Sequence, residues 1–364
     1  MKASRYVVPL AMLAAASISL TACASNESAA SSTTTATSAN LSGSLNGIGS
    51  SAQGTAETTW IAGFQSANSK VTINYDPQGS GAGRKSFISG AADFAGSDAH
   101  LSDAEAAGSF SGCVAGTKAI DLPVYISPIA IAYNVDGVTD LKLDADAIAG
   151  IFSGAITTWN DPKIAALNAG ASLPAAPITV VHRSDDSGTT QNFTEYLAAN
   201  APTVWTKPSG QTYPYQVGDA AKGTSGVATS VKNAKNSIAY IDESGSAGLS
   251  IAELKVGSQW VKISAAGAAD VAAKSPLAPG RPSNDIAVNV DRKNTDKNAW
   301  PIVLISYLIT CQQYQDASKA ALVKAYVNYV ASPAAQKAAA AQAGSAPLSS
   351  ALAAKVMAAA NSIK

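Results

Sequence analysis

A short polar segment, Arg183–Thr189, gathers residue types that bind small anions. It contains an arginine, two aspartates and a Ser-Gly-Thr run. Ser187 stands at the expected N-cap of a helix, and the first N–H groups of a helix have no partner within it. Those N–H groups and the helix dipole favour a negative charge, and a guanidinium adds two parallel donors. The segment therefore predicts an oxyanion site between a buried strand at 178–181 and the following helix.

Nucleophilic catalysis is the alternative chemistry for the same segment. Ser187, His182 and Asp185 are close in sequence, and such residues can form a serine triad. However, no G-x-S-x-G turn surrounds Ser187. His182 and Arg183 also point to opposite sides of their strand, because successive side chains alternate. We therefore expect His182 to be structural and the chain not to be an enzyme.

Two further loops and one aspartate could form the other half of an anion site. The loops Gly47–Ala52 and Pro77–Gly83 and the residue Asp98 each follow a short apolar strand. Both loops match nucleotide-binding motifs only in part, since the first lacks a downstream acidic partner and the second has Arg84 where a P-loop has glycine. Ligands bind at the carboxyl ends of strands in open α/β sheets, so these loops are expected to face one cleft.

The apolar pattern predicts an α/β fold of two lobes joined by crossing strands. The long β-type run 121–135 can pass from one lobe to the other, and the C-terminal helices of 317–364 would pack on the first lobe. We expect lobe I to comprise 41–128 with 286–364, and lobe II to comprise 129–285. The other expected elements are helices at 55–68, 84–89, 144–152, 162–168 and 227–233, strands at 71–75, 92–98, 237–241, 286–290 and 300–310, and a hairpin at 254–263.

The N-terminus has the features of an export signal. Lys2 and Arg5 precede an apolar stretch, Val7–Leu20, that is too short for a stable membrane span. The sequence Leu-Thr-Ala-Cys ending at Cys23 resembles a bacterial lipobox, which implies removal of residues 1–22 and acylation of Cys23. Lipid chains such as palmitate would hold the protein on the extracytoplasmic face of the cell membrane. Residues 23–40 are rich in Ser, Thr and Ala and are expected to be a flexible tether.

Charge and cysteine content narrow the partners. The chain has 25 basic and 25 acidic side chains, and without Lys2 and Arg5 the balance is 23 to 25. Nucleic acids require a basic face, so they are not expected as partners. In an exported protein the two remaining cysteines, Cys113 and Cys311, are expected to form a disulfide. We expect no metal and no cofactor, because the two histidines have no ligands at suitable spacing.

Four segments in this order resemble the PstS-type phosphate-binding proteins: GIGSSA, PQGSGAG, ADFAGSDAHLSD and VVHRSDDSGT. Gly344–Leu348 matches a further family feature. The resemblance implies a type II periplasmic-binding-protein fold whose two lobes close on inorganic phosphate. It also implies delivery of phosphate to an ABC permease in the membrane, by a protein that acts as a monomer. The alternatives are a secreted phosphatase-like enzyme and a binding protein for sulfate or molybdate.

The resemblance also implies a set of phosphate ligands, carried over position by position. Asp185 would support the guanidinium of Arg183, and Asp186, where many relatives have glycine, would face solvent. The implied ligands are Ser51, Ala52, Ser80 and Asp98 from lobe I, and Arg183, Ser187, Gly188 and Thr189 from lobe II.

Overall fold

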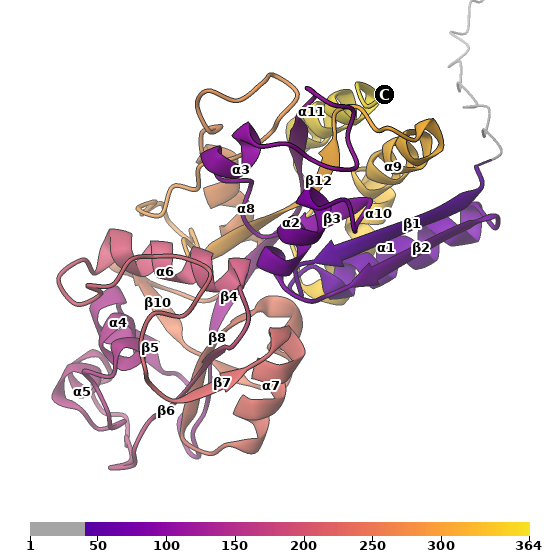
Figure 1. Ribbon diagram of the computed structural model, residues 1–364. Helices are drawn as coiled ribbons and strands as arrows, with labels where there is room; N and C mark the ends of the chain where they lie inside the picture. The colour runs from indigo at the N-terminus through magenta and orange to yellow at the C-terminus, as the bar shows by residue number, and fades with distance from the viewer. Residues whose placement is uncertain (1–40) are drawn as a thin grey trace, which may run out of the picture. The chain divides into compact units, whose positions relative to one another are not determined.

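The computed structural model describes residues 41–364 (Figure 1). The predicted signal peptide at 1–22, the predicted acylation of Cys23 and the predicted tether at 23–40 lie outside the described residues. The described chain is built on a nine-stranded sheet whose main order is β2-β1-β3-β12-β4-β8-β6-β7, with β9 paired to β4. A second sheet of three strands has the order β11-β10-β5.

One end of the large sheet is formed by the first three strands. β1 (Gly43–Gly49) pairs in parallel with β2 (Val71–Asp76) and with β3 (Phe94–Ser97). Because the three strands are parallel, the loops that follow them lie at the same edge of the sheet. These loops lead into α1 (Gly54–Ala67) and α2 (Ser80–Ile88) and, after β3, to Asp98.

The strand β4 (Ala119–Asn134) joins the two parts of the sheet and is buried along almost all its length. Up to Pro128 it pairs antiparallel with β12 (Val303–Cys311), and from Ile129 onward it pairs with β8 (Ser237–Asp242). Figure 1 shows β4 running from the elements around β12 to those around β8. We propose that lobes I and II meet where β4 changes partner, and we use the predicted boundaries for them.

The predicted oxyanion-binding segment, 183–189, lies between a strand and a helix. β6 (Thr179–Arg183) pairs in parallel with β8 and β7 (Asp219–Ala221), and α6 (Gly188–Asn200) follows after a short loop. The other elements are α3 (Asp103–Ala107), β5 (Lys142–Leu143), α4 (Ala145–Ser153), α5 (Pro162–Leu167), α7 (Gly223–Asn233), η1 (Glu243–Gly245), β9 (Ser250–Ile251), β10 (Glu253–Val256), β11 (Gln259–Val261), α8 (Ala265–Lys274), α9 (Ala317–Val330), α10 (Pro333–Ala343) and α11 (Ser350–Asn361).

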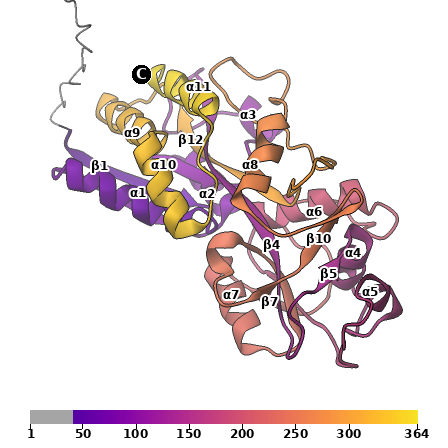
Figure 2. The same cartoon turned by 180° about the vertical axis from the view of Figure 1, so that it is seen from behind.

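The C-terminal helices lie with the first strands, as predicted for lobe I. Figure 2 shows α9 and α10 beside α1 and β1, with α11 next to α9. Trp60 of α1 donates from its indole N–H to the carbonyl of Ala335 in α10, at 3.0 Å. A disulfide between Cys113 and Cys311 confirms the predicted pairing and ties the end of β12 to the loop before β4. Among residues 41–364 no helix is long and apolar enough to cross a membrane.

One predicted strand is not a strand in the structure. The strand predicted at 286–290 is an extended segment with only one isolated bridge, between Leu277 and Val288. Its N–H groups bind elsewhere: that of Val288 donates to the hydroxyl of Tyr307, and that of Ile286 to the carbonyl of Asp121. An alternating apolar pattern therefore arose without strand pairing.

The helices α2 and α7 each begin four residues earlier than predicted. At α2 the reason is the glycine run, which favours a loop by propensity alone. A Cβ on Gly81 would lie 2.5 Å from the Cβ of Asp186, and one on Gly83 would lie 2.5 Å from the carbonyl oxygen of Ile48. The glycines therefore let the first turns of α2 pack closely against both lobes.

Candidate functional site

On the lobe II side, Arg183 at the end of β6 is held by Asp185 in the loop that follows. The guanidinium Nε donates to Asp185 Oδ1 at 2.7 Å, and Nη2 donates to Oδ2 at 2.5 Å. Arg183 is 4% exposed, so this fork-shaped pair is largely removed from water. Burial alone would raise the pKa of Asp185, but the hydrogen bonds and charge of Arg183 outweigh it and hold that pKa below its ordinary value. The carboxylate thus stays ionised and fixes the plane of the guanidinium.

The helix that follows begins at the predicted N-cap. The hydroxyl oxygen of Ser187 accepts from the N–H of Thr190 at 3.1 Å, which leaves the hydroxyl hydrogen for another acceptor. Gly188 and Thr189 form the first turn of α6, where backbone N–H groups have no partner inside the helix. Lobe II therefore presents a cation and a set of hydrogen-bond donors.

On the lobe I side, Asp98 is the central residue and is 3% exposed. Its Oδ1 accepts hydrogen bonds from the hydroxyl of Ser50 and, at 2.9 Å, from that of Ser306. Its Oδ2 lies 3.2 Å from the hydroxyl of Thr189, which belongs to lobe II. Burial raises the pKa of Asp98, and the hydroxyl donors and the charge of Arg183 oppose that shift.

The two sides are in direct contact at Gly188. A Cβ there would lie 2.6 Å from the Cβ of Asp98 and 2.6 Å from the hydroxyl oxygen of Ser80, which in turn accepts from the N–H of Asp98 at 3.1 Å. A Cβ on Gly79 would lie 2.5 Å from Asp185 Oδ2. The structure thus brings Asp98 and Ser80 against the start of α6, and places the Arg183 pair against the second loop.

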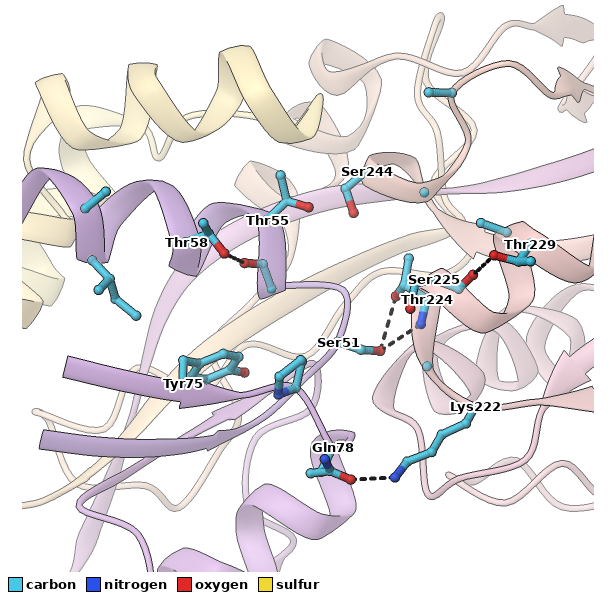
Figure 3. A pocket seen from close by; sticks show the side chains of 18 of the residues that line it. Ser51, Thr55, Thr58, Tyr75, Gln78, Lys222, Thr224, Ser225, Thr229 and Ser244 are labelled. Atoms are coloured by element: carbon cyan, nitrogen blue, oxygen red, sulfur yellow. Dashed lines mark hydrogen bonds between the residues drawn. The ribbon is translucent and has the colours of Figure 1, made fainter. Parts of the chain in front are cut away.

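Ser51 and Ala52 have other partners in this structure. The hydroxyl of Ser51 lies 3.2 Å from that of Thr224 and accepts from the Thr224 N–H at 3.1 Å, whereas the Ala52 N–H donates to Ser50 at 3.1 Å. Ser51 borders a cavity of about 950 Å³ between α1 and β2 on one side and α7 and η1 on the other (Figure 3). The N–H of Gly223, on the same cavity, donates to Asp185 Oδ1 at 3.0 Å.

Two polar contacts join the lobes at the periphery. The ammonium of Lys85 lies 2.8 Å from Asp186 Oδ2, and that of Lys222 donates to Gln78 Oε1 at 2.5 Å. Figure 3 shows the Lys222–Gln78 contact at one side of the cavity. Asp186 was expected to face solvent; it is partly exposed but turns toward Lys85 and also accepts from Thr212 at 2.9 Å.

Sequence reasoning missed four residues that touch the site. Ser50 and Ser306 bind Asp98, Thr224 binds Ser51, and the amide of Asn192 donates to the carbonyl of Asp98 at 2.7 Å. A signal existed for Ser306, because it is a hydroxyl residue inside the apolar run of 300–310, where a polar side chain needs a partner. Asn192 lies on α6 and carried no such signal.

Neither a triad nor a metal site is found in the described part of the chain. His182 stacks on Tyr213 with ring centroids 4.0 Å apart, and its Nδ1 lies 3.0 Å from the carbonyl oxygen of Arg183. This environment is that of a structural histidine, as expected. Among residues 41–364 no group of three or more His, Cys, Asp or Glu side chains could hold a metal ion.

Comparison with known proteins identifies the family of this chain. Residues 34–334 match the family model described as the PBP superfamily domain. The chain is 39% identical to the phosphate-binding protein PstS 3 of Mycobacterium leprae over 287 residues, which cover 78% of this chain and 77% of that protein. It is 35% identical to the phosphate-binding protein PstS 2 of Mycobacterium tuberculosis over 373 residues, which cover both chains fully.

Solved structures share the fold. A high-affinity periplasmic phosphate-binding protein named PfluDING, bound with phosphate, superposes with a TM-score of 0.69 at 24% identity, covering 87% of this chain and 93% of that one. A phosphate ABC transporter substrate-binding protein from Clostridium perfringens gives a TM-score of 0.60 at 18% identity, with 84% and 100% coverage. The predicted two-lobed fold is thereby confirmed. With this fold and these relatives, the chain belongs to the PBP superfamily and, within it, to the PstS-type phosphate-binding proteins.

Proposed function

We propose that this protein is an extracytoplasmic substrate-binding protein, not an enzyme, that captures inorganic phosphate between its lobes and delivers it to an ABC importer. The observation that carries the proposal is the meeting of Asp98 with the start of α6, beside the buried pair of Arg183 and Asp185. One side supplies donors and positive charge, and the other supplies an acceptor. The relatives named above are described as phosphate-binding proteins.

The proposed ligand set is the one implied by the resemblance to the PstS-type proteins, and the meeting of Asp98 and Ser80 with the start of α6 supports it. The donors to the phosphate oxygens would be one guanidinium, four hydroxyls and two backbone N–H groups. They belong to Arg183, to Ser51, Ser80, Ser187 and Thr189, and to Ala52 and Gly188, respectively. Asp98 would accept a hydrogen bond from the proton that phosphate still carries near neutral pH. Sulfate carries no such proton, so its oxygen would face the Asp98 carboxylate lone pair to lone pair. A site built around one required hydrogen bond rejects an analogue lacking it by roughly 10⁴–10⁵.

Closure of the lobes is part of the proposal, because the ligands come from both. Phosphate would shift the population from an open to a closed form, which the permease would distinguish. Small-angle X-ray scattering should show compaction when phosphate is added.

We further propose a monomer tethered by lipid at Cys23 on the outer face of the cell membrane. Cys23→Ala should release the protein from membranes.

Isothermal titration calorimetry with phosphate, sulfate and arsenate tests the central assignment. We expect one phosphate per chain and no detectable sulfate binding at the same concentration. Equal binding of sulfate would favour a general oxyanion-binding protein instead. Hydrolysis of a chromogenic phosphate ester by the metal-free protein would favour the phosphatase alternative.

A further inference from the structure

Asp98 Oδ1 is the end point of a chain of buried polar side chains in lobe I. The first residue in contact with this oxygen, Ser50, can act only as a hydrogen-bond donor to it. Its hydroxyl oxygen already accepts from the N–H groups of Ala52 at 3.1 Å and Gln53 at 3.2 Å. Its single hydrogen is therefore available for Asp98, which it contacts.

The second donor, Ser306, lies between two acceptors. Its hydroxyl oxygen is 2.9 Å from Asp98 Oδ1 and 3.0 Å from Gln53 Oε1. A hydroxyl carries one hydrogen, so it cannot donate to both oxygens at once. The oxygen and nitrogen of a glutamine amide are assigned from their partners. Turning over the amide of Gln53 lets its nitrogen donate to Ser306, and Ser306 can then donate to Asp98.

This orientation places a requirement on Glu57, one turn further along α1. The turned amide would direct its oxygen at Glu57 Oε1, which lies 2.9 Å from the amide atom now facing it. Two oxygens at that distance need a hydrogen between them, and a protonated Glu57 supplies it. Its other oxygen, Oε2, can then accept from the hydroxyl of Tyr326, at 2.6 Å.

The surroundings of Glu57 favour its neutral form. It is fully buried, and burial raises its pKa to about 8, with the Tyr326 hydrogen bond acting in the opposite direction. The titratable groups around it are Tyr326 of α9, Tyr75 of β2 and, beyond Gln53, Asp98. From α10, α1 receives the contact of Trp60 with a backbone carbonyl. By contrast, Asp98 has the charge of Arg183 and three hydroxyl donors nearby.

We propose that Tyr326, Glu57, Gln53 and Ser306 form a one-way hydrogen-bond chain that ends on an ionised Asp98, with the proton held by Glu57. The chain rests on the proposed phosphate function and makes Gln53 and Ser306 positioning residues for anion selectivity. With Ser50 this hydrogen-bond chain fills Oδ1, while within the described part of the protein Oδ2 has only the Thr189 hydroxyl at 3.2 Å and remains the acceptor for a protonated anion. Were the chain reversed, the proton would lie on Asp98, and Asp98 would donate to sulfate.

Infrared spectroscopy tests the location of the proton without any ligand. The difference spectrum between the wild-type chain and Glu57→Gln at neutral pH should contain the C=O stretch of one protonated carboxylic acid. That band should disappear as the pH rises past about 8. Its absence at neutral pH would mean that Glu57 is ionised, which overturns the proposal.

Ser306→Ala supplies a second, independent test by titration with phosphate and with sulfate. The variant removes one hydrogen-bond donor to the ionised Asp98 and thereby raises the pKa of Asp98. Because a protonated Asp98 can donate to sulfate, we expect the ratio of phosphate affinity to sulfate affinity to fall by about 10-fold. Sulfate binding should strengthen as the pH is lowered. The matched control is Thr310→Val, which removes from the same strand a buried hydroxyl that has no hydrogen-bond partner among residues 41–364.

The outcomes separate this inference from the function itself. If Ser306→Ala leaves the phosphate-to-sulfate affinity ratio unchanged while the wild-type protein binds phosphate tightly, the proposed hydrogen-bond chain is wrong and the phosphate function stands. A ratio that falls equally in Thr310→Val overturns the hydrogen-bond chain too, because the effect would then be one of packing. Absence of phosphate binding by the wild-type protein refutes the proposed function, and the infrared band still decides where the proton lies.

Discussion

Two aspartates, the buried Asp98 in lobe I and the half-buried Asp185 in lobe II, have pKa values that are shifted in opposite directions. Asp185 in lobe II faces a guanidinium, and the pKa of its carboxyl is lowered despite burial. Asp98 in lobe I faces hydroxyl groups, and burial raises the pKa of its carboxyl. The residue type is the same, and the difference comes from the neighbours.

This contrast divides the work of the proposed site. Both carboxylate oxygens of Asp185 accept hydrogen bonds from Arg183, so the negative charge of Asp185 orients the guanidinium. Asp98 has no cation in hydrogen-bonding contact within the described chain, and Oδ2 has one neutral donor at 3.2 Å. The lobe II side would therefore attract any small oxyanion, and the lobe I side would select one that carries a proton.

The largest effect is expected from Asp98→Asn. The amide of asparagine can donate a hydrogen bond to sulfate as well as accept one from phosphate, so the site no longer requires a protonated anion. We expect the phosphate-over-sulfate preference to narrow by up to roughly 10⁴, the scale on which such sites discriminate. Competitive titration of both anions measures it, and an unchanged preference would remove Asp98 from the selective role.

Arg183→Ala comes next and should weaken every oxyanion. Loss of a charged hydrogen bond costs about 1.5–3 kcal/mol, which corresponds to roughly 10- to 100-fold in affinity. Arg183→Lys is the control, because it keeps the charge but loses the fork. Calorimetric affinities equal to those of the wild type would show that donors other than Arg183 supply the attraction.

Asp185→Asn should act mainly on stability and in a pH-dependent way. The folded-state pKa of Asp185 is lowered, so its contribution is present above the ordinary aspartate pKa and is lost as the pH falls through the folded value. We expect a loss of about 1–2 kcal/mol at neutral pH, where the variant leaves a buried guanidinium without its charge partner. Urea unfolding of both proteins should converge in strong acid. A constant difference across pH would contradict this sign.

The smallest effect is expected from Lys85→Ala at the periphery. Lys85 and Asp186 join the lobes, yet the lysine side chain is 74% exposed. Exposed pairs contribute little and are screened by salt, so phosphate affinity should change less than about twofold. A large loss, measured by the same titration, would mean that this contact controls closure.

The parts of the fold that sequence predicted best are those with strong apolar patterns. The run containing Pro123 and Pro128 is one continuous strand, and α9 and α10 end at Val330 and Ala343, next to the helix-breaking residues Pro333 and Gly344. Where local propensity and packing disagree, prediction was less accurate. The start of α2 at Ser80 is an example, because close approach to Ile48 and Asp186 favours glycine there.

For the site, sequence alone supported the helix end at Ser187 and the neighbouring Arg183. The partners of Asp98 could not be predicted in the same way. Ser50 is 48 residues away and Ser306 is 208 residues away along the chain, and only the folded sheet brings them together. A pattern in one segment does not contain such a contact.

One set of titrations tests most directly whether Arg183 supplies the affinity for oxyanions and Asp98 the selectivity for phosphate. The ratio of phosphate to sulfate affinity is measured for the wild-type protein, Arg183→Ala and Asp98→Asn under identical conditions. We predict that Arg183→Ala weakens the binding of both anions and keeps the ratio within a few-fold, whereas Asp98→Asn removes most of the preference for phosphate. If Arg183→Ala lost this preference as fully as Asp98→Asn, the assignment of selectivity to Asp98 would be wrong.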